Sequence, residues 1–183
     1  MAKNVATLLH PILPMIKIEF FIPFENYLNS NLFEFETVIK NAPKKRIGSV
    51  SVEELCAVRD YPHGLYLLFS QQNTLWYVGK ATSRSFIERL PAHFDVREDA
   101  WFNTVSKYIK RDDKIHDYNS AIDFGLNLEV LLIGIKYKAV SVRLEKVLRS
   151  YLKPRLNSCA GDFSPDSKMA MLTNYIESAS IIT

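Results

Sequence analysis

The chain has few of the residues that mark secreted or zinc-binding domains. It holds only two cysteines, Cys56 and Cys159, and their spacing is not that of metal ligands. Two cysteines do not make a disulfide framework, so a reducing interior is the natural setting. The apolar stretch from Val5 to Ile16 is interrupted by Pro11 and Pro14 and is followed by no small-residue cleavage pattern. We therefore expect a cytoplasmic protein.

Long apolar runs, internal repeats and low-complexity tracts are also missing. No run approaches the roughly 18 uninterrupted apolar residues of a membrane helix, so no membrane partner is expected. In contrast, 48% of the residues are apolar and 12% are aromatic, which is enough to build a hydrophobic core. The 183 residues predict one domain, or one domain with a small appendage.

Acidic residues are scarce in one stretch of the chain. The net charge is only +3, but the excess of basic over acidic residues lies wholly within residues 64–157. Within it, a single acid, Glu145, is surrounded by basic residues: Lys136, Lys138, Arg143, Lys146, Arg149, Lys153 and Arg155. Such a surface attracts a polyanion. On charge alone, a solvated helix face explains the pattern equally well.

The first third of the chain is expected to fold rather than to act as a linker. Alternating apolar and polar residues from Ile16 to Phe20 predict a short strand, and residues 31–41 predict a helix. Ser51, with Glu54 three residues later, forms a capping box at the start of a second helix. We interpret residues 1–61 as an α/β extension packed on the core.

The middle of the chain predicts three strands. The runs Gly64–Ser70 and Leu75–Lys80 are rich in aliphatic and aromatic residues, and the polar residues 71–74 join them. This pattern is typical of a β-hairpin. The run from Leu128 to Ile135, apolar apart from Glu129, favours a third strand that is buried on both faces.

Three helices are predicted around these strands. Thr82 or Ser83 is expected to cap the first, and residues 99–110 form the second, with Trp101 among its inward-facing residues. The third covers residues 141–153, where apolar side chains recur at helical spacing. The residues beyond 157 hold only a weak helical pattern, at 167–176.

Six positions in residues 62–157 occur in a distinctive order. Two tripeptides, Gly64-Leu65-Tyr66 and Tyr77-Val78-Gly79, are followed by Arg89, His93, Glu145 and Asn157. Residues 62–157, about half of the chain, thereby resemble the GIY-YIG nuclease family.

The resemblance implies an α+β fold with a small three-stranded antiparallel sheet flanked by helices, which agrees with the predicted elements. Residues 62–157 would form the nuclease domain, between the extension at 1–61 and a C-terminal tail at 158–183. The chain would be a metal-dependent DNA endonuclease with one divalent ion, Mg²⁺ or Mn²⁺.

The resemblance also implies roles for the acid and the tyrosines. Glu145 would hold the ion, because Mg²⁺ accepts one carboxylate together with water and substrate oxygens. Without the family pattern, Glu145 is most simply a partner of Arg149 or Lys146 in a surface salt bridge. Tyr66 would act as a general base or orient the attacking water, which for a base requires nearby cations to lower its pKa. Tyr77 would contact the scissile phosphate or share the water.

The resemblance implies that the remaining residues would bind the phosphate or support the site. Arg89 would grip the phosphate as a bidentate fork, and His93, four residues later, would relay a proton or hold the tyrosine. Pro91 lies between them and puts their helical spacing in question. Asn157 would hydrogen-bond the backbone or a tyrosine hydroxyl. The residues expected to contact DNA are Lys80, Arg89, Arg143, Lys146 and Arg149.

Two other functions fit the same sequence. The first is a catalytically inactive nucleic-acid-binding module of the same fold, in which Pro91 would be the first candidate cause of the lost turnover. The second is an interaction protein whose resemblance to the family pattern is fortuitous. Residues 1–61 carry no zinc ligands, helix-turn-helix signature or strongly basic arm, so a separate sequence-reading module is not expected. Cutting both DNA strands would require a homodimer or two successive nicks.

Overall fold

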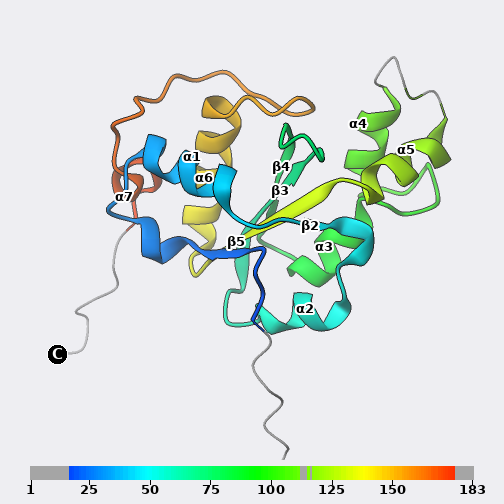
Figure 1. Cartoon of the computed structure of the whole chain (residues 1–183), viewed down its shortest axis with the longest axis horizontal. Coiled ribbons are helices and arrows are strands. Elements are labelled where there is room, and N and C mark those ends of the chain that lie inside the picture. The colour runs from blue at the N-terminus through cyan, green and yellow to red at the C-terminus, as the bar shows by residue number, and fades with distance from the viewer. Residues whose placement is uncertain (1–16, 112–114, 116, 176–183) are drawn as a thin grey trace, which may run out of the picture.

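The structure, a computed structural model, describes residues 17–111, 115 and 117–175 (Figure 1). Within them the strands are β1 (Phe21–Pro23), β2 (Lys45–Arg46), β3 (His63–Phe69), β4 (Leu75–Ala81) and β5 (Glu129–Ile135). The helices are α1 (Leu32–Asn41), α2 (Val52–Ala57), α3 (Phe86–Ala92), α4 (Thr104–Lys110), α5 (Tyr118–Leu126), α6 (Lys138–Tyr151) and α7 (Met169–Thr173), with short 3₁₀ turns at Phe24–Tyr27 and Ile47–Ser49.

The strands form one mixed five-stranded sheet. β3 lies at its centre and pairs antiparallel with both β4 and β5. β1 pairs parallel with β5, and the short β2 pairs antiparallel with β5. The α+β class is therefore confirmed, but the expected three-stranded antiparallel sheet is wrong. The three predicted strands form its antiparallel part, and the extension adds two more along β5, whose backbone groups would otherwise stay unpaired.

The first predicted strand is misplaced. The structure has no strand among the described residues 17–20, and β1 begins at Phe21 instead. β1 pairs with only three residues of β5, which is too short for a two-residue period to reveal it. Ile16 and the apolar stretch before it lie outside the described residues.

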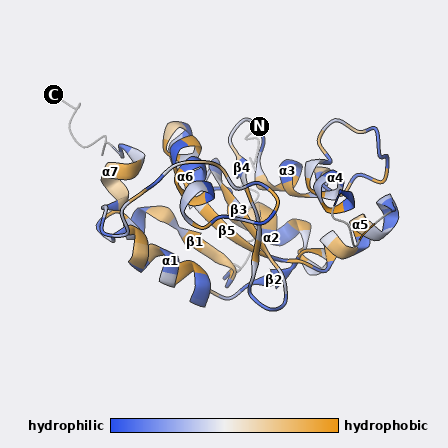
Figure 2. Cartoon of the chain, turned by 90° about the horizontal axis from the view of Figure 1, so that it is seen from above, coloured by the Kyte–Doolittle hydropathy of each residue, from blue (hydrophilic) through white to orange (hydrophobic). Residues whose placement is uncertain are grey.

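The sheet is covered on both faces. Helices α1, α6 and α7 lie on one side of it, and α2, α3, α4 and α5 lie on the other (Figure 1). Each face of the sheet has its own hydrophobic core. Side chains alternate along β3, so Leu65 and Leu67 pack in the core beneath α1, α6 and α7, while Tyr66 and Leu68 pack in the core on the opposite face. The strands at the centre are largely apolar (Figure 2), as expected for strands buried on both faces. β5 lies within the run 128–135 that predicted such a strand.

The first residue of a helix is set by its side-chain cap more than by the spacing of its apolar residues. The predicted capping box of α2 is present, with Ser51 and Glu54 each bonding the other's backbone amide. α3 is capped by Ser85 with Glu88, so the expected caps Thr82 and Ser83 are wrong. The capping box sets the start of α3, because the Glu88 carboxylate accepts hydrogen bonds from both the backbone amide and the hydroxyl of Ser85, each at 2.9 Å. α6 begins at Lys138, slightly before the predicted start.

The predicted helix over residues 99–110 begins only at Thr104, and Trp101 is 87% exposed rather than inward-facing. The buried Asn103 side chain explains this, since it donates to the carbonyl oxygens of Arg97 and Glu98 at 2.9 and 3.1 Å. These bonds stabilise a loop where apolar spacing alone suggested a helix. Helix α5 is an element that we did not predict.

The C-terminal segment returns to the first part of the chain. α7 lies inside the predicted helical stretch, whose last residue, Ile176, lies outside the described residues. The backbone amide of Met169 donates to the Ser30 carbonyl at 2.9 Å, next to the start of α1. In the described part of the chain, no helix has the length and apolar character needed to cross a membrane.

We predict that residues 62–183 do not fold without the extension. Its removal exposes the β5 edge and deletes buried apolar side chains: Ile22, Phe24, Leu32, Phe35 and Ile39. Each contributes about 1.5–3 kcal/mol, and a whole domain is stable by only about 5–15 kcal/mol. Thermal unfolding followed by circular dichroism should show no cooperative transition. Deletion of residues 1–16, which removes none of the described contacts, is the control. A monomeric 62–183 fragment with a cooperative melt would contradict the prediction.

Candidate active site

The two tyrosines lie on adjacent antiparallel strands, as predicted. Tyr66 of β3 pairs with Gly79 of β4, and its ring is stacked on that of Tyr77 with centroids 6.2 Å apart. A Cβ atom at Gly79 would stand 2.2 Å from Cζ of Tyr66, so any larger residue would displace the ring. The glycine of the second tripeptide thus makes room for the tyrosine of the first.

His93 completes this buried group. The Tyr66 hydroxyl is hydrogen-bonded to Nε2 of His93, and both residues are fully buried. Burial, assisted by the charge of Arg89, lowers the pKa of His93 from 6.5 to about 3. The imidazole is therefore neutral at pH 7 and can accept the hydrogen of the phenol.

Pro91 does not remove His93 from the site. It is the next-to-last residue of α3, and His93 still has helical backbone angles at the C-cap. The Phe94 amide donates to the Pro91 carbonyl at 2.9 Å, so the turn continues past the proline. Near the end of a short helix, proline removes one backbone donor without ending the local geometry.

Both phenols are hard to ionise in the protein alone. Burial raises the pKa of Tyr66 well above its usual value of 10, and the positive charge of Arg89 counters only part of this rise. Burial likewise raises the pKa of Tyr77 to about 12. The lowered pKa expected for a tyrosine base is therefore not produced by the protein's own cations. Tyr66 is a neutral phenol at pH 7.

Glu145, on α6, is nearly buried, with 8% of its surface exposed. Its Oε2 is paired with Nζ of Lys80, and its Oε1 lies 3.5 Å from Nη1 of Arg149. The salt bridge to Arg149 that the sequence allowed is thus present, and Lys80 is a partner that it did not suggest. Among the described residues, no three His, Cys, Asp or Glu side chains cluster as metal ligands. The donor set fits Mg²⁺ or Mn²⁺ only where water and phosphate oxygens complete the coordination.

The site lies at the free edge of β4. Strand alternation sends Lys80 to the face opposite Gly79, toward α6, which explains its contact with Glu145. The charge of Glu145 raises the pKa of both Tyr66 and Tyr77, so the carboxylate is within electrostatic reach of both hydroxyls. Residues from both faces of the sheet therefore meet around one strand.

Asn157 braces this edge. Its side chain accepts a hydrogen bond from the Val78 amide at 3.2 Å and donates one to the Val78 carbonyl at 2.7 Å. The resemblance allowed either the backbone or a tyrosine hydroxyl as the partner of Asn157, and these two hydrogen bonds are to the backbone. Nε of Arg149 donates to the Asn157 carbonyl at 2.7 Å, which ties the brace to α6. Asn157 thereby pairs both backbone groups of Val78, and the Leu156 amide donates to the Trp76 carbonyl at 2.9 Å, so this part of the edge is paired without a further strand.

A cationic pocket opens beside these residues. It has a volume of about 220 Å³ and is lined by Lys80, Thr82, Ser83, Arg84, Arg89 and Phe102. Cζ of Arg84 and Cζ of Arg89 lie 3.9 and 5.7 Å from the centre of the Phe102 ring, so cation–π contacts hold both guanidinium groups. Sequence reasoning missed Arg84, which lies in a loop without periodicity, and it placed Phe102 on the inward face of the predicted 99–110 helix, whereas Phe102 lies in the loop before α4.

The other predicted DNA-binding residues on α6 point elsewhere. Nη1 of Arg143 lies 3.4 Å from the Thr173 carbonyl in α7, and Lys146 is exposed to solvent. Residues four apart share a helix face, so Arg149 joins Glu145 at the site while the other two do not.

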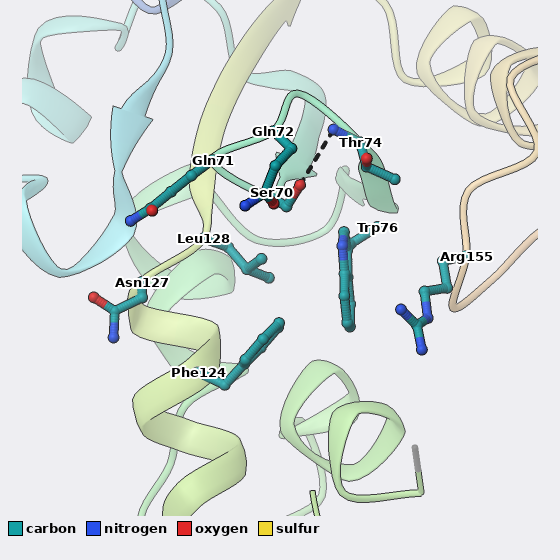
Figure 3. Close-up of a pocket in the computed structure, with 9 residues that line it drawn as sticks. All are labelled: Ser70, Gln71, Gln72, Thr74, Trp76, Phe124, Asn127, Leu128 and Arg155. Carbon is teal, nitrogen blue, oxygen red and sulfur yellow. Dashed lines mark hydrogen bonds between the residues drawn. The ribbon is translucent and has the colours of Figure 1, made fainter. Parts of the chain in front are cut away.

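A second hollow, of about 410 Å³, lies at the hairpin turn between β3 and β4 (Figure 3). At its centre the Trp76 ring is flanked by Phe124, with centroids 4.7 Å apart, and by Arg155, whose Cζ is 4.4 Å from the ring. It shares no lining residue with the cationic pocket.

No family model, curated protein or solved structure matches this chain.

The buried His93 predicts an acid-sensitive fold. Its pKa is about 3 in the folded protein against 6.5 when exposed, so the unfolded chain binds more protons between these values. The free energy of unfolding should fall as pH drops from 6.5 toward 3, by up to about 1.4 kcal/mol per pH unit from this group. Urea unfolding at several pH values should show a shallower dependence for His93→Gln, which keeps an acceptor for Tyr66. Equal pH dependence in both proteins would contradict the assignment.

Proposed function

We propose that this protein is a metal-dependent endonuclease that hydrolyses DNA phosphodiester bonds. The carrying observation is the convergence, at one strand edge, of the neutral Tyr66–His93 pair, the cationic pocket and the carboxylate of Glu145. Phosphodiester hydrolysis needs a group that accepts a proton from water, positive charge on the phosphoryl oxygens, and help for the leaving alkoxide.

The cationic pocket supplies the phosphate site. It is lined by Lys80, Arg84 and Arg89 and by no carboxylate. The planar fork of Arg89 suits two phosphoryl oxygens, and its contact with Phe102 holds the guanidinium in place before substrate arrives. Once a phosphate is bound, Lys80 can exchange its partner Glu145 for a phosphoryl oxygen.

Tyr66 and His93 supply the proton acceptor. With His93 in the tautomer that carries its hydrogen on Nδ1, Tyr66 donates its hydroxyl hydrogen to Nε2, which leaves an oxygen lone pair for a hydrogen of the attacking water. As the water oxygen bonds to phosphorus and the bond to the departing oxygen breaks, the water proton passes to Tyr66 and the phenol proton to Nε2. Burial is the main cause of the low pKa of His93, and the charge of Arg89 lowers it further. The bound phosphate offsets this second contribution, so proton uptake becomes easier. The departing alkoxide takes its proton from solvent.

Glu145 is the residue that would hold a divalent ion. Such an ion would neutralise charge on the phosphoryl oxygens and on the departing alkoxide. Release of Lys80 toward the substrate frees Oε2 of Glu145 for this role. Arg149 and the Asn157 brace keep the carboxylate aligned with the edge of β4.

A second function is favoured by one observation. Lys80 and Arg149 occupy both carboxylate oxygens of Glu145 in the protein alone. If these ion pairs persist on DNA, the same surface binds nucleic acid without a metal and without turnover. This is the binding module that the sequence also allowed.

Glu145→Gln separates the two functions. We predict that it abolishes nicking of supercoiled plasmid in Mg²⁺ or Mn²⁺, because it removes the carboxylate that would hold the ion. DNA affinity, measured by fluorescence anisotropy, should be unchanged or tighter, since a negative charge is removed beside the cationic pocket. The control is Glu36→Gln, which breaks the 2.6 Å ion pair to Lys40 on α1 and should cut normally.

Three results would count against the nuclease. Metal-dependent nicking that survives in Glu145→Gln would remove the metal role. Parent protein that binds DNA but never nicks it would favour the binding module. Absence of any salt-dependent DNA affinity would exclude both functions.

A further inference from the structure

Trp101 is the most exposed large apolar side chain among the described residues, at 87% exposure. It lines a pocket of about 510 Å³, here the tryptophan pocket, formed by Arg84, Ala92, Asp95, Arg97, Asp99, Ala100, Trp101 and Phe102. Arg84 and Phe102 also line the cationic pocket, so the two pockets adjoin.

The loop that carries Trp101 is held in place by the core. Asn103 is fully buried and bonds the Arg97 and Glu98 carbonyls, and Nζ of Lys107 donates to the Ala100 carbonyl at 2.9 Å. Nη2 of Arg97 is paired with Asp95 at 2.7 Å. The fold thus presents an aromatic ring to solvent on a fixed support.

The two pockets differ in charge. The cationic pocket has three cations and no carboxylate, whereas two aspartates balance two arginines in the tryptophan pocket. The first suits a phosphate. The second suits an uncharged planar group with polar edges, since carboxylates repel phosphate but accept hydrogen bonds from ring amino groups. In a DNA strand, the group next to a phosphate that has these properties is a nucleobase.

We infer that Trp101 stacks on an unpaired nucleobase beside the phosphate held in the cationic pocket. A base inside a duplex is already stacked and paired, so it reaches Trp101 only when single-stranded or displaced from the helix. The substrate class is therefore DNA with an unpaired nucleotide next to the cut. This inference rests on the proposed function, because it takes the cationic pocket as the phosphate site.

The chain offers an internal fluorescence control, because it has only two tryptophans. Trp76 is 7% exposed, with Phe124 and Arg155 against its ring (Figure 3), so it has no free face for a base. In the full-length Trp76→Phe protein, Trp101 is the remaining emitter. If Trp76→Phe folds poorly, the same signal is obtained as the difference in emission between the parent protein and Trp101→Phe.

The test is titration in EDTA, where binding is measured without cleavage, with a short single-stranded deoxycytidine oligonucleotide, whose bases carry a ring amino group, and with a blunt duplex. Trp101 emission should be quenched by the single strand and not by the duplex. Trp101→Ala should weaken single-strand binding by about 5- to 150-fold, the range for one stacked base, and leave duplex binding unchanged. Phe33→Ala, which truncates an aromatic ring that is 60% exposed on α1, is the matched control and should change neither.

The outcomes distinguish the two proposals. Equal losses for both DNAs in Trp101→Ala, no loss for either, or DNA binding without quenching would overturn the stacking site while leaving nuclease function to the Glu145→Gln assay. Failure of the parent protein to bind either DNA would overturn both.

Discussion

The contact on which the site depends is the one between the Tyr66 ring and the backbone of Gly79. The ring lies where a Cβ atom would otherwise stand, and this carries its hydroxyl across β4 to His93. Because both partners are buried, the phenol stays protonated and the imidazole stays neutral. A hydrogen bond between two neutral groups in a dry environment is stable, yet it is poised to pass a proton once charge arrives beside it.

Charge is distributed around that pair by strand alternation. Successive residues of β4 point to opposite faces, so Gly79 serves the tyrosine while Lys80 reaches Glu145 on α6. The Asn157 brace completes the strand edge, and Arg149 links it to the carboxylate. The cations and the single carboxylate thus surround one strand edge without any of them being placed in the apolar core.

Much of this arrangement was predictable, for local reasons. The β3–β4 hairpin, β5 and α6 follow from runs of apolar residues that belong to one element each, and Tyr66, Tyr77 and Glu145 lie on these elements. Asn157 was named through the family resemblance, because its position after Pro154 alone indicates only a loop residue. The extra strands β1 and β2 were not predictable, because pairing of two or three residues leaves no period in the sequence.

Side-chain partners that are distant in sequence were equally out of reach. The exposure of Trp101 depends on bonds from Asn103, and the neutrality of Tyr66 depends on burial beneath α3 and its neighbours. Arg84 joins the site through the Phe102 ring, a contact across the chain that no spacing rule reports. Local patterns therefore placed the candidate site residues on their elements, while tertiary packing set their protonation and their pockets.

The central claim is that the Tyr66 hydroxyl takes part in the proton transfer, and Tyr66→Phe tests it most directly. The change keeps the ring over Gly79 and removes one buried hydrogen bond, at a cost of about 1–3 kcal/mol in stability. Single-turnover DNA cleavage should fall by about two to four orders of magnitude in a protein that still unfolds cooperatively. Tyr151→Phe, which removes a hydroxyl bonded to Glu36 away from the site, should cleave at the parent rate. Near-parent cleavage by folded Tyr66→Phe would contradict the account.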